Sequence, residues 1–217
     1  MKTSLPQEQN FAGKIILITS IFSLLYAITR YHVFGNVPWN DFPFFILNKA
    51  ISLAAFIMLT FNFSIGPLKN LGLNVSEGWL NARQTLGMTG FLYVLVHVLM
   101  SFMIFKPEIF GKFFEEDGSL TLFAGLSMLG GIFAFVVLWA YNLSFKTTMK
   151  EDAKFMRFIT SRKFLLVALL FSLAHIFFMG YEGWLKLSDW HGGMPPISLV
   201  AFTFFAICYI INLIGRK

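Results

Sequence analysis

Six long apolar segments dominate this chain and restrict its fold more than any other feature. They cover approximately residues 13–32, 43–64, 84–105, 120–143, 163–181 and 197–214. A helix needs about 20 residues to cross the hydrocarbon core of a bilayer, and each segment meets or approaches that length. Hydrophobic residues make up 57% of the 217 residues, and the mean hydropathy of +0.70 is too high for a soluble domain. The sequence therefore predicts an all-α integral membrane protein, with one domain over residues 1–217 forming a six-transmembrane-helix bundle.

Basic residues are distributed unevenly between the two ends of this predicted bundle. Twelve Lys and Arg residues lie on the side of the termini and the second and fourth connections, against five on the other side. The five are Arg30, Lys49, Lys106, Lys112 and Lys186. Because short cytoplasmic loops are enriched in Lys and Arg, we expect both termini in the cytoplasm. The same distribution explains the net charge of +6, so we expect membrane lipid around the chain and no nucleic-acid partner.

Two of the apolar segments contain one deeply placed histidine each. His97 follows Arg83 by 14 residues and His175 follows Arg162 by 13, so each imidazole lies about 20 Å along its helix from a basic residue. The third and fifth helices run in the same direction, which predicts the two imidazoles at one depth. A neutral imidazole in apolar surroundings is a good ligand for haem iron, and a pair at one depth favours ligation from both faces. The alternative is that each histidine only hydrogen-bonds to a neighbouring helix.

Small residues share the predicted helix faces of these two histidines. They are Gly87, Gly90 and Val94 for His97, and Ala168 and Ser172 for His175. Small side chains let a flat ring approach the backbone, but they also let two helices pack closely. Taken alone, close packing explains these residues better, as it does Gly130 and Gly131 in the fourth segment.

The remaining histidines and the single cysteine limit the kind of site that we expect. His32 and His191 fall near the ends of apolar segments, where ordinary interfacial histidines are common. Cys208 is the only cysteine, so the sequence contains neither a disulfide pair nor a CxxCH site for covalent haem attachment. Any haem is therefore expected to bind without a covalent link.

Two short motifs resemble a known family of membrane proteins. The pattern R-x-x-x-G-x-x-G-F-x-Y-x-L-x-H runs from Arg83 to His97, and the sequence A-H-I-F-F surrounds His175. Both resemble the ferric-reductase-like transmembrane domain family, and within it most closely the haem-binding membrane subunit of the bacterial periplasmic methionine sulfoxide reductase system. The resemblance implies a bacterial inner-membrane location and one haem b held between the third and fifth helices by His97 and His175.

The sequence also departs from the two-haem members of this family. Those members have further histidines nearer the cytoplasm, where this chain has Arg83 and Arg162. With one haem, electrons from the cytoplasmic side need another carrier, so we expect a bound quinone or FMN near the inner end. Arg83, Arg162 and Lys163 are the expected partners of its phosphate or carbonyl, or of a haem propionate. The alternative for these three residues is anchoring of the cytoplasmic side by positive charge.

These observations lead to one functional prediction and two alternatives. The prediction is a membrane cytochrome b that passes electrons from the quinone pool or a flavoprotein to a periplasmic reductase or another acceptor. The sequence contains no GxGxxG motif or P-loop, so a nicotinamide is not expected to bind directly. The first alternative is a haem-free structural or assembly subunit. The second, a transporter with histidine proton relays, is disfavoured because the apolar segments lack acidic residues.

Overall fold

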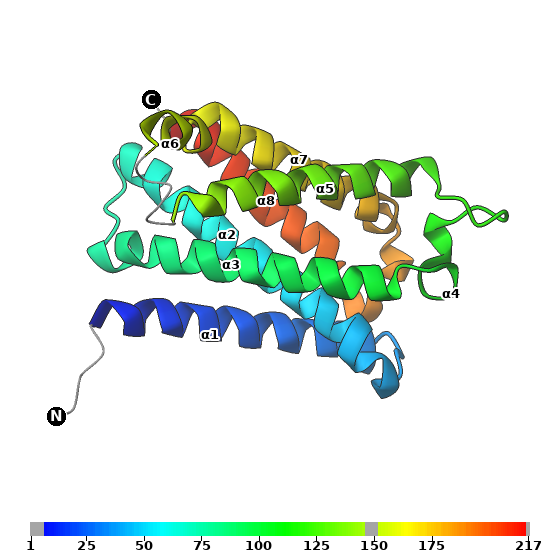
Figure 1. Ribbon diagram of the computed structural model, residues 1–217. Coiled ribbons are helices and arrows are strands. Elements are labelled where there is room, and N and C mark those ends of the chain that lie inside the picture. The colour runs from blue at the N-terminus through cyan, green and yellow to red at the C-terminus, as the bar shows by residue number, and fades with distance from the viewer. Residues whose placement is uncertain (1–6, 146–151, 216–217) are drawn as a thin grey trace.

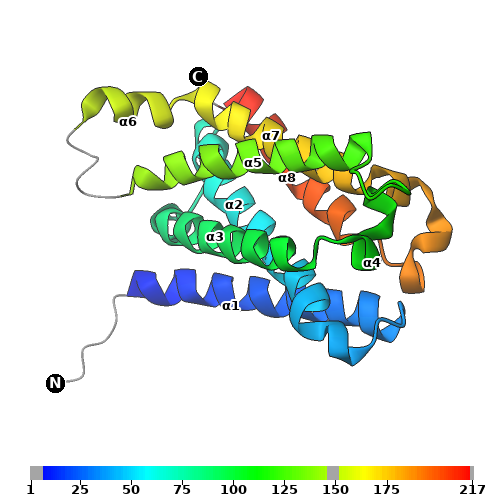
Figure 2. The same cartoon turned by 45° about the vertical axis from the view of Figure 1, so that its right-hand side comes forward.

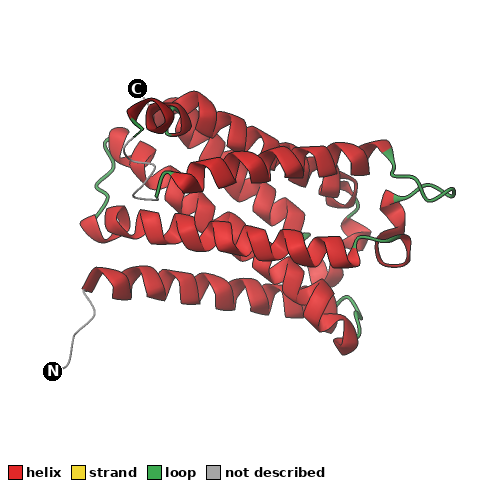
Figure 3. Ribbon diagram, in the orientation of Figure 1, coloured by secondary structure: helices red, strands yellow, loops and turns green. Residues whose placement is uncertain are grey.

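The computed structural model describes residues 7–145 and 152–215, and these residues are helical apart from the connecting loops and turns (Figure 1). The described residues contain no strand, only an isolated bridge between Phe114 and Leu120 (Figure 3). Five of the basic residues that predicted the orientation lie outside the described residues: Lys2, Lys146, Lys150, Arg216 and Lys217. The cytoplasmic placement of the termini therefore stays a prediction.

Six helical spans are long and apolar enough to cross a membrane. They are α1 (Gln7–Ala27) continued by the π-helix η1 (Ile28–Val33), the π-helix η3 (Phe42–Ile46) continued by α2 (Leu47–Asn70), α3 (Glu77–Ile104), α5 (Leu122–Leu143), α7 (Arg162–Leu185) and α8 (Ile197–Gly215). Shorter helices lie between them: η2 (Trp39–Asp41), α4 (Pro107–Phe110), η4 (Gly111–Phe113), α6 (Ala153–Ile159), η6 (Leu187–Asp189) and η7 (His191–Gly193). The predicted all-α, six-helix membrane architecture is confirmed.

The helix α2 lies at the centre of the bundle. It packs against α1, α3 and α8, while α5 packs against α7 and α7 against α8 (Figures 1 and 2). Most of α2 is buried, whereas no more than a third of each of the other five spans is buried and many of their residues are only partly covered. Many of the exposed side chains are large and apolar, such as Ile18, Leu92 and Leu170. A bilayer supplies the apolar surroundings that these side chains require.

The two ends of the bundle differ in structure, and we name them after their short helices. At the α4 end lie α4 and the turns η6 and η7; at the α6 end, α1 begins and α8 ends (Figure 1). Arg30 ties the α4 end together: it is buried and donates hydrogen bonds to the carbonyls of Met194 and, at 3.0 Å, Asp189. Tyr26 adds a hydrogen bond of 2.7 Å to the carbonyl of Pro195. The turn before α8 is thereby held against α1 and η1.

The second span extends beyond the predicted end near residue 64, because α2 continues through Pro67 to Asn70. A proline inside a helix lacks an N–H and leaves the carbonyl four residues earlier without its partner. That carbonyl belongs to Phe63, and the Asn212 side chain of α8 donates to it over 3.2 Å. A neighbouring helix therefore replaces the missing backbone hydrogen bond, which lets the helix run on.

The third span begins earlier than predicted. We expected it to begin near residue 84, but α3 begins at Glu77, so Arg83 lies in its second turn. The first turns carry polar side chains, and hydropathy alone does not detect a helix that projects beyond the apolar core. The two motif histidines keep their predicted helices: His97 lies in α3 and His175 in α7.

Candidate functional site

The imidazole of His97 is oriented by a side chain from α2. Its Nδ1 lies 2.7 Å from Oδ1 of Asn48, and Nδ2 of Asn48 donates to Oγ of Ser101 over 3.1 Å. Because the amide oxygen only accepts, Nδ1 of His97 carries the proton in this contact. Nε2 then has a free lone pair, which is the form of imidazole that binds a metal.

The imidazole of His175 is oriented in the same way by α5. Its Nδ1 lies 2.9 Å from the backbone carbonyl of Ser127, and Oγ of Ser127 donates to the carbonyl of His175 over 2.9 Å. Ser127 is fully buried, so this reciprocal pair joins α5 to α7 away from water. A carbonyl only accepts, so here too the proton is on Nδ1 and the lone pair of Nε2 is free.

Two glycines let α5 approach α7 closely enough for this contact. A Cβ on Gly131 would lie 2.8 Å from Nδ1 of His175, and one on Gly130 would lie 3.1 Å from its backbone nitrogen. Any larger side chain at Gly131 therefore displaces the imidazole. The prediction that these glycines serve close helix packing is confirmed, and the structure adds that the packed partner is His175 itself.

The imidazoles of His97 and His175 lie within electrostatic range of one another. Both side chains are half-buried. In each, Nδ1 contacts an oxygen of a neighbouring helix, as expected if the histidines only hydrogen-bond between helices. In each, however, this contact leaves Nε2 available. A haem needs only two protein ligands because the porphyrin supplies four nitrogens, and this donor set suits it. Residues 7–145 and 152–215 contain no cluster of three or more His, Cys, Asp or Glu side chains arranged to hold a metal ion.

The small residues on the face of His97 do not form a groove for a flat ring. A Cβ on Gly87 would lie 2.9 Å from Asn62, and one on Gly90 would lie 3.0 Å from Leu59, both on α2. These glycines therefore serve the close packing of α3 on α2, which was the alternative explanation. The sequence motif alone does not identify the helix that a glycine faces.

The space between α3 and α7 on the α6 side of the histidines is filled by side chains. Val94 of α3 and Ala168 of α7 contact one buried apolar cluster. Its other members include Leu59, Phe63, Leu138, Leu165, Leu169 and Phe205. Ser172, one turn before His175, is buried and hydrogen-bonds within its own helix to the carbonyl of Ala168. The expected ring contact of Ala168 and Ser172 is thus replaced by core packing.

Arg83 and Arg162, distant in sequence, line one pocket at the α6 end. The pocket has a volume of about 460 Å³, and Lys69 contributes a third basic side chain. The remaining lining residues are Gly66, Pro67, Asn70 and Leu80. The structure therefore brings together two of the three predicted basic residues, while Lys163 is exposed and lies outside the lining.

Both arginines also have structural contacts. Nε of Arg83 donates to the carbonyl of Asn62 over 3.2 Å, one turn before the proline of α2, and its guanidinium packs over Gly66. Arg162 donates from the start of α7 to the carbonyl of Leu213 near the end of α8. Donating to a carbonyl of a neighbouring helix and to one near a helix terminus is a structural role, which the expectation of charge anchoring alone did not include.

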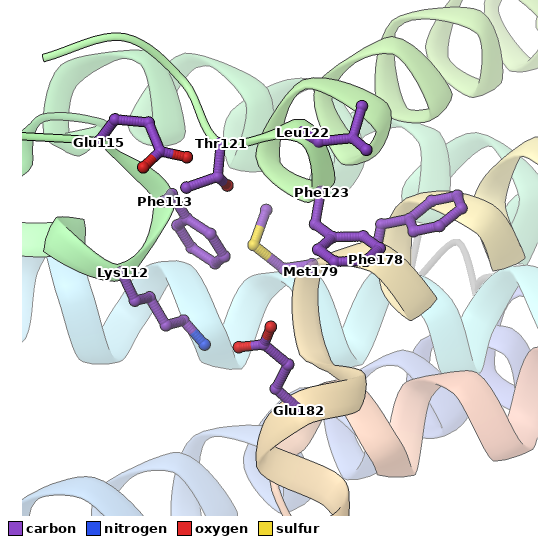
Figure 4. Close-up of a pocket in the computed structure, with 9 residues that line it drawn as sticks. All are labelled: Lys112, Phe113, Glu115, Thr121, Leu122, Phe123, Phe178, Met179 and Glu182. Carbon is purple, nitrogen blue, oxygen red and sulfur yellow. The ribbon is translucent and has the colours of Figure 1, made fainter. Parts of the chain in front are cut away.

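A second pocket lies at the α4 end, one helical turn beyond His175. It has a volume of about 330 Å³, and Met179 projects into it between the loop after α3 and the end of α7 (Figure 4). The side chains of Lys112 and Glu182 point toward one another across it (Figure 4). Burial lowers the pKa of Lys112, and the carboxylates of Glu182 and Asp189 oppose that effect. The pocket thus combines apolar and charged side chains one helical turn from His175.

The other histidines lie apart from this pair. Nδ1 of His32 lies 2.8 Å from the carbonyl of Val37, and its ring packs against Trp39 with centroids 4.8 Å apart. His191 lies in the turn η7. Both are at the α4 end, where the interfacial interpretation placed them.

Four residues of the site were not identified from the sequence. Asn48, Ser127 and Gly131 orient the histidines, and Lys49 lies within electrostatic range of both imidazoles. Asn48 and Lys49 form a polar pair near the start of an apolar segment, and this pattern can be detected in the sequence. No local pattern identifies Ser127, because its contact with His175 joins residues 48 positions apart.

Comparison with known proteins does not place the chain in a family. No model of a known protein family matches it, and a search of curated proteins finds no match.

Proposed function

We propose that this protein is a membrane cytochrome b of the ferric-reductase-like kind, with one haem b held by His97 and His175. The observation that carries the proposal is the shared arrangement of these residues. In each, Nδ1 is bound by an oxygen from an adjacent helix, and Nε2 is left as a ligand. When bound, the haem iron would supply one-electron chemistry.

In this proposal the protein orients the ligands and excludes water. Asn48 and Ser127 hold the imidazoles in one tautomer, and Gly131 sets the distance between α5 and α7. Apolar packing between α3 and α7 on the α6 side supports a single haem, since Phe63 and Phe205 occupy that level. At the level where two-haem members of the ferric-reductase-like family have their second pair of histidines, this chain has Arg83 and Arg162.

The two pockets suggest where electrons enter and leave. The basic pocket at the α6 end suits the carbonyls of a quinone or the phosphate of FMN, so we assign donor binding to Lys69, Arg83 and Arg162. The pocket around Met179 lies one turn from His175 and suits electron transfer to a periplasmic reductase or another acceptor. This assignment places the α6 end in the cytoplasm of a bacterial inner membrane, as the distribution of basic residues predicts.

The test is spectroscopic. The purified full chain, expressed with sufficient haem and reduced with dithionite, should show the Soret and α bands of low-spin haem b. His97→Ala and His175→Ala should each abolish the low-spin spectrum, whereas His32→Ala and His191→Ala should retain it. A colourless wild-type protein would instead favour the haem-free structural subunit, and retained spectra in both helix variants would refute the assigned ligands.

A further inference from the structure

Lys49 is a membrane-embedded lysine without a polar partner in the described part of the chain. It lies in the first turn of α2 and is half-buried. Its ammonium lies 5.4 Å from the ring centroids of Phe45 and Phe110, and these cation–π contacts are its only side-chain interactions among residues 7–145 and 152–215. Neither aromatic ring supplies a hydrogen-bond acceptor or a negative charge.

The charges around this ammonium are also unfavourable. Its main electrostatic neighbours among the protein groups are Lys112 and Arg30, both of which are cations. Lysine within a membrane span is costly unless an anion or water compensates its charge. An apolar residue at this position would fill the space between Phe45 and Phe110 without that cost. We therefore infer that the ammonium of Lys49 has a functional role.

The position of Lys49 relates it to the histidine pair. It directly follows Asn48, which binds His97, and both His97 and His175 are within its electrostatic range. Lys49 also lies toward the α4 end, because it is the third residue of α2 after the π-helix η3. An anion bound there would lie within electrostatic range of both imidazoles.

We propose that Lys49 binds a carboxylate of the group held by His97 and His175, namely a haem propionate. This inference rests on the proposed function and adds to it an anion-binding residue in the first turn of α2, Lys49, which would hold a propionate of the haem. The ammonium and the propionate neutralise one another, and the phenyl rings of Phe45 and Phe110 hold the lysine side chain in place. It differs from the sequence-based expectation, in which Arg83, Arg162 or Lys163 bound the propionate.

The variant Lys49→Met tests this assignment, with Lys49→Gln as a second variant of different polarity and Lys49→Arg as the conservative one. The expected result is a retained bis-histidine spectrum with a lower midpoint potential, because an uncompensated propionate stabilises the ferric iron. Haem transfer to added apomyoglobin should be several-fold faster than in the wild type. Lys49→Arg should restore both values, and Lys112→Met, which removes a nearby cation outside the membrane spans, should change them less.

A chemical variant of the cofactor separates this role from a general charge effect. In full-length protein reconstituted with haem dimethyl ester, which has no free carboxylates, Lys49→Met and wild type should lose haem at equal rates. Equal potentials and transfer rates with ordinary haem would overturn the inference while leaving the histidine assignment intact. A wild-type protein that binds no haem would refute the proposed function and this inference together.

Discussion

Oδ1 of Asn48 lies 2.7 Å from Nδ1 of His97, so a residue of α2 determines which nitrogen of a histidine on α3 is free. Replacing Asn48 by Leu removes this acceptor and leaves Nδ1 of His97 only the longer contact of 3.5 Å with Oγ of Ser101. Loss of such an outer contact typically lowers affinity by about 10- to 100-fold, and we expect haem affinity to fall by that order.

The measurement is haem transfer from Asn48→Leu to apomyoglobin, followed by the Soret band. Ser52→Ala is the matched control, since Ser52 lies one turn further along α2 and its hydroxyl donates to the carbonyl of Lys49 in its own helix. Wild-type retention in Asn48→Leu would show that the contact with His97 does not set ligand geometry.

Gly131→Ala should disrupt the ligand on the other side. The added Cβ would lie 2.8 Å from Nδ1 of His175, so the imidazole must turn away from the carbonyl of Ser127. Such overpacking typically costs about 1–3 kcal/mol of stability, and we expect a loss of low-spin haem together with a lower unfolding temperature.

Gly125→Ala on the same helix is the control for this substitution. A Cβ there meets no atom within 4 Å, so the change should be neutral or stabilise α5 by up to about 1 kcal/mol. If the two alanine variants behave alike in the reduced spectrum and in thermal unfolding, Gly131 does not support His175.

Asn212 and Pro67 should be energetically coupled. Asn212→Leu leaves the carbonyl of Phe63 buried without a donor, which typically costs about 1–3 kcal/mol. Pro67→Ala restores the backbone N–H, so Asn212→Leu should cost less in that background.

A double-mutant cycle measured by reversible unfolding in detergent gives this coupling. Additive effects would mean that Asn212 stabilises the bundle by another route, for instance through its hydrogen bond of 2.8 Å to the carbonyl of Cys208.

The basic pocket at the α6 end predicts that substitutions of Arg162 and of its neighbour Lys163 differ in their effect on the rate of haem reduction. Arg83→Gln and Arg162→Gln should slow the reduction of the haem by a soluble quinol or by reduced FMN, because both side chains line the pocket. Lys163→Gln should leave the rate unchanged, since Lys163 lies outside the lining. Stopped-flow absorbance at the Soret band measures all three.

Dithionite reduction serves as the control, because it needs no donor site and should give the same final spectrum in each variant. Equal slowing by Lys163→Gln would indicate that the bulk positive charge of this surface, rather than the pocket, attracts the donor.

Side-chain chemistry along the chain was enough to predict most of the architecture. The six apolar segments, their number and the helices that contain His97 and His175 follow from hydropathy, since a bilayer imposes a minimum apolar length on every span. Boundaries were less predictable. Hydropathy ends at the apolar core, whereas α3 begins at Glu77, and Pro67 continues a helix because Asn212 of another span supplies the missing donor.

The candidate site was likewise predictable from the sequence only in part. The sequence by itself determined which imidazoles lie within the membrane and that Arg83 and Arg162 lie at one level, because helical rise converts residue number into depth. Only the tertiary structure decided that Asn48 and Ser127 orient the imidazoles, that Gly87 faces α2, and that Lys49 has no polar partner in the described chain. Depth is a property of one helix, but the direction in which a side chain points toward its neighbours depends on how all six helices pack.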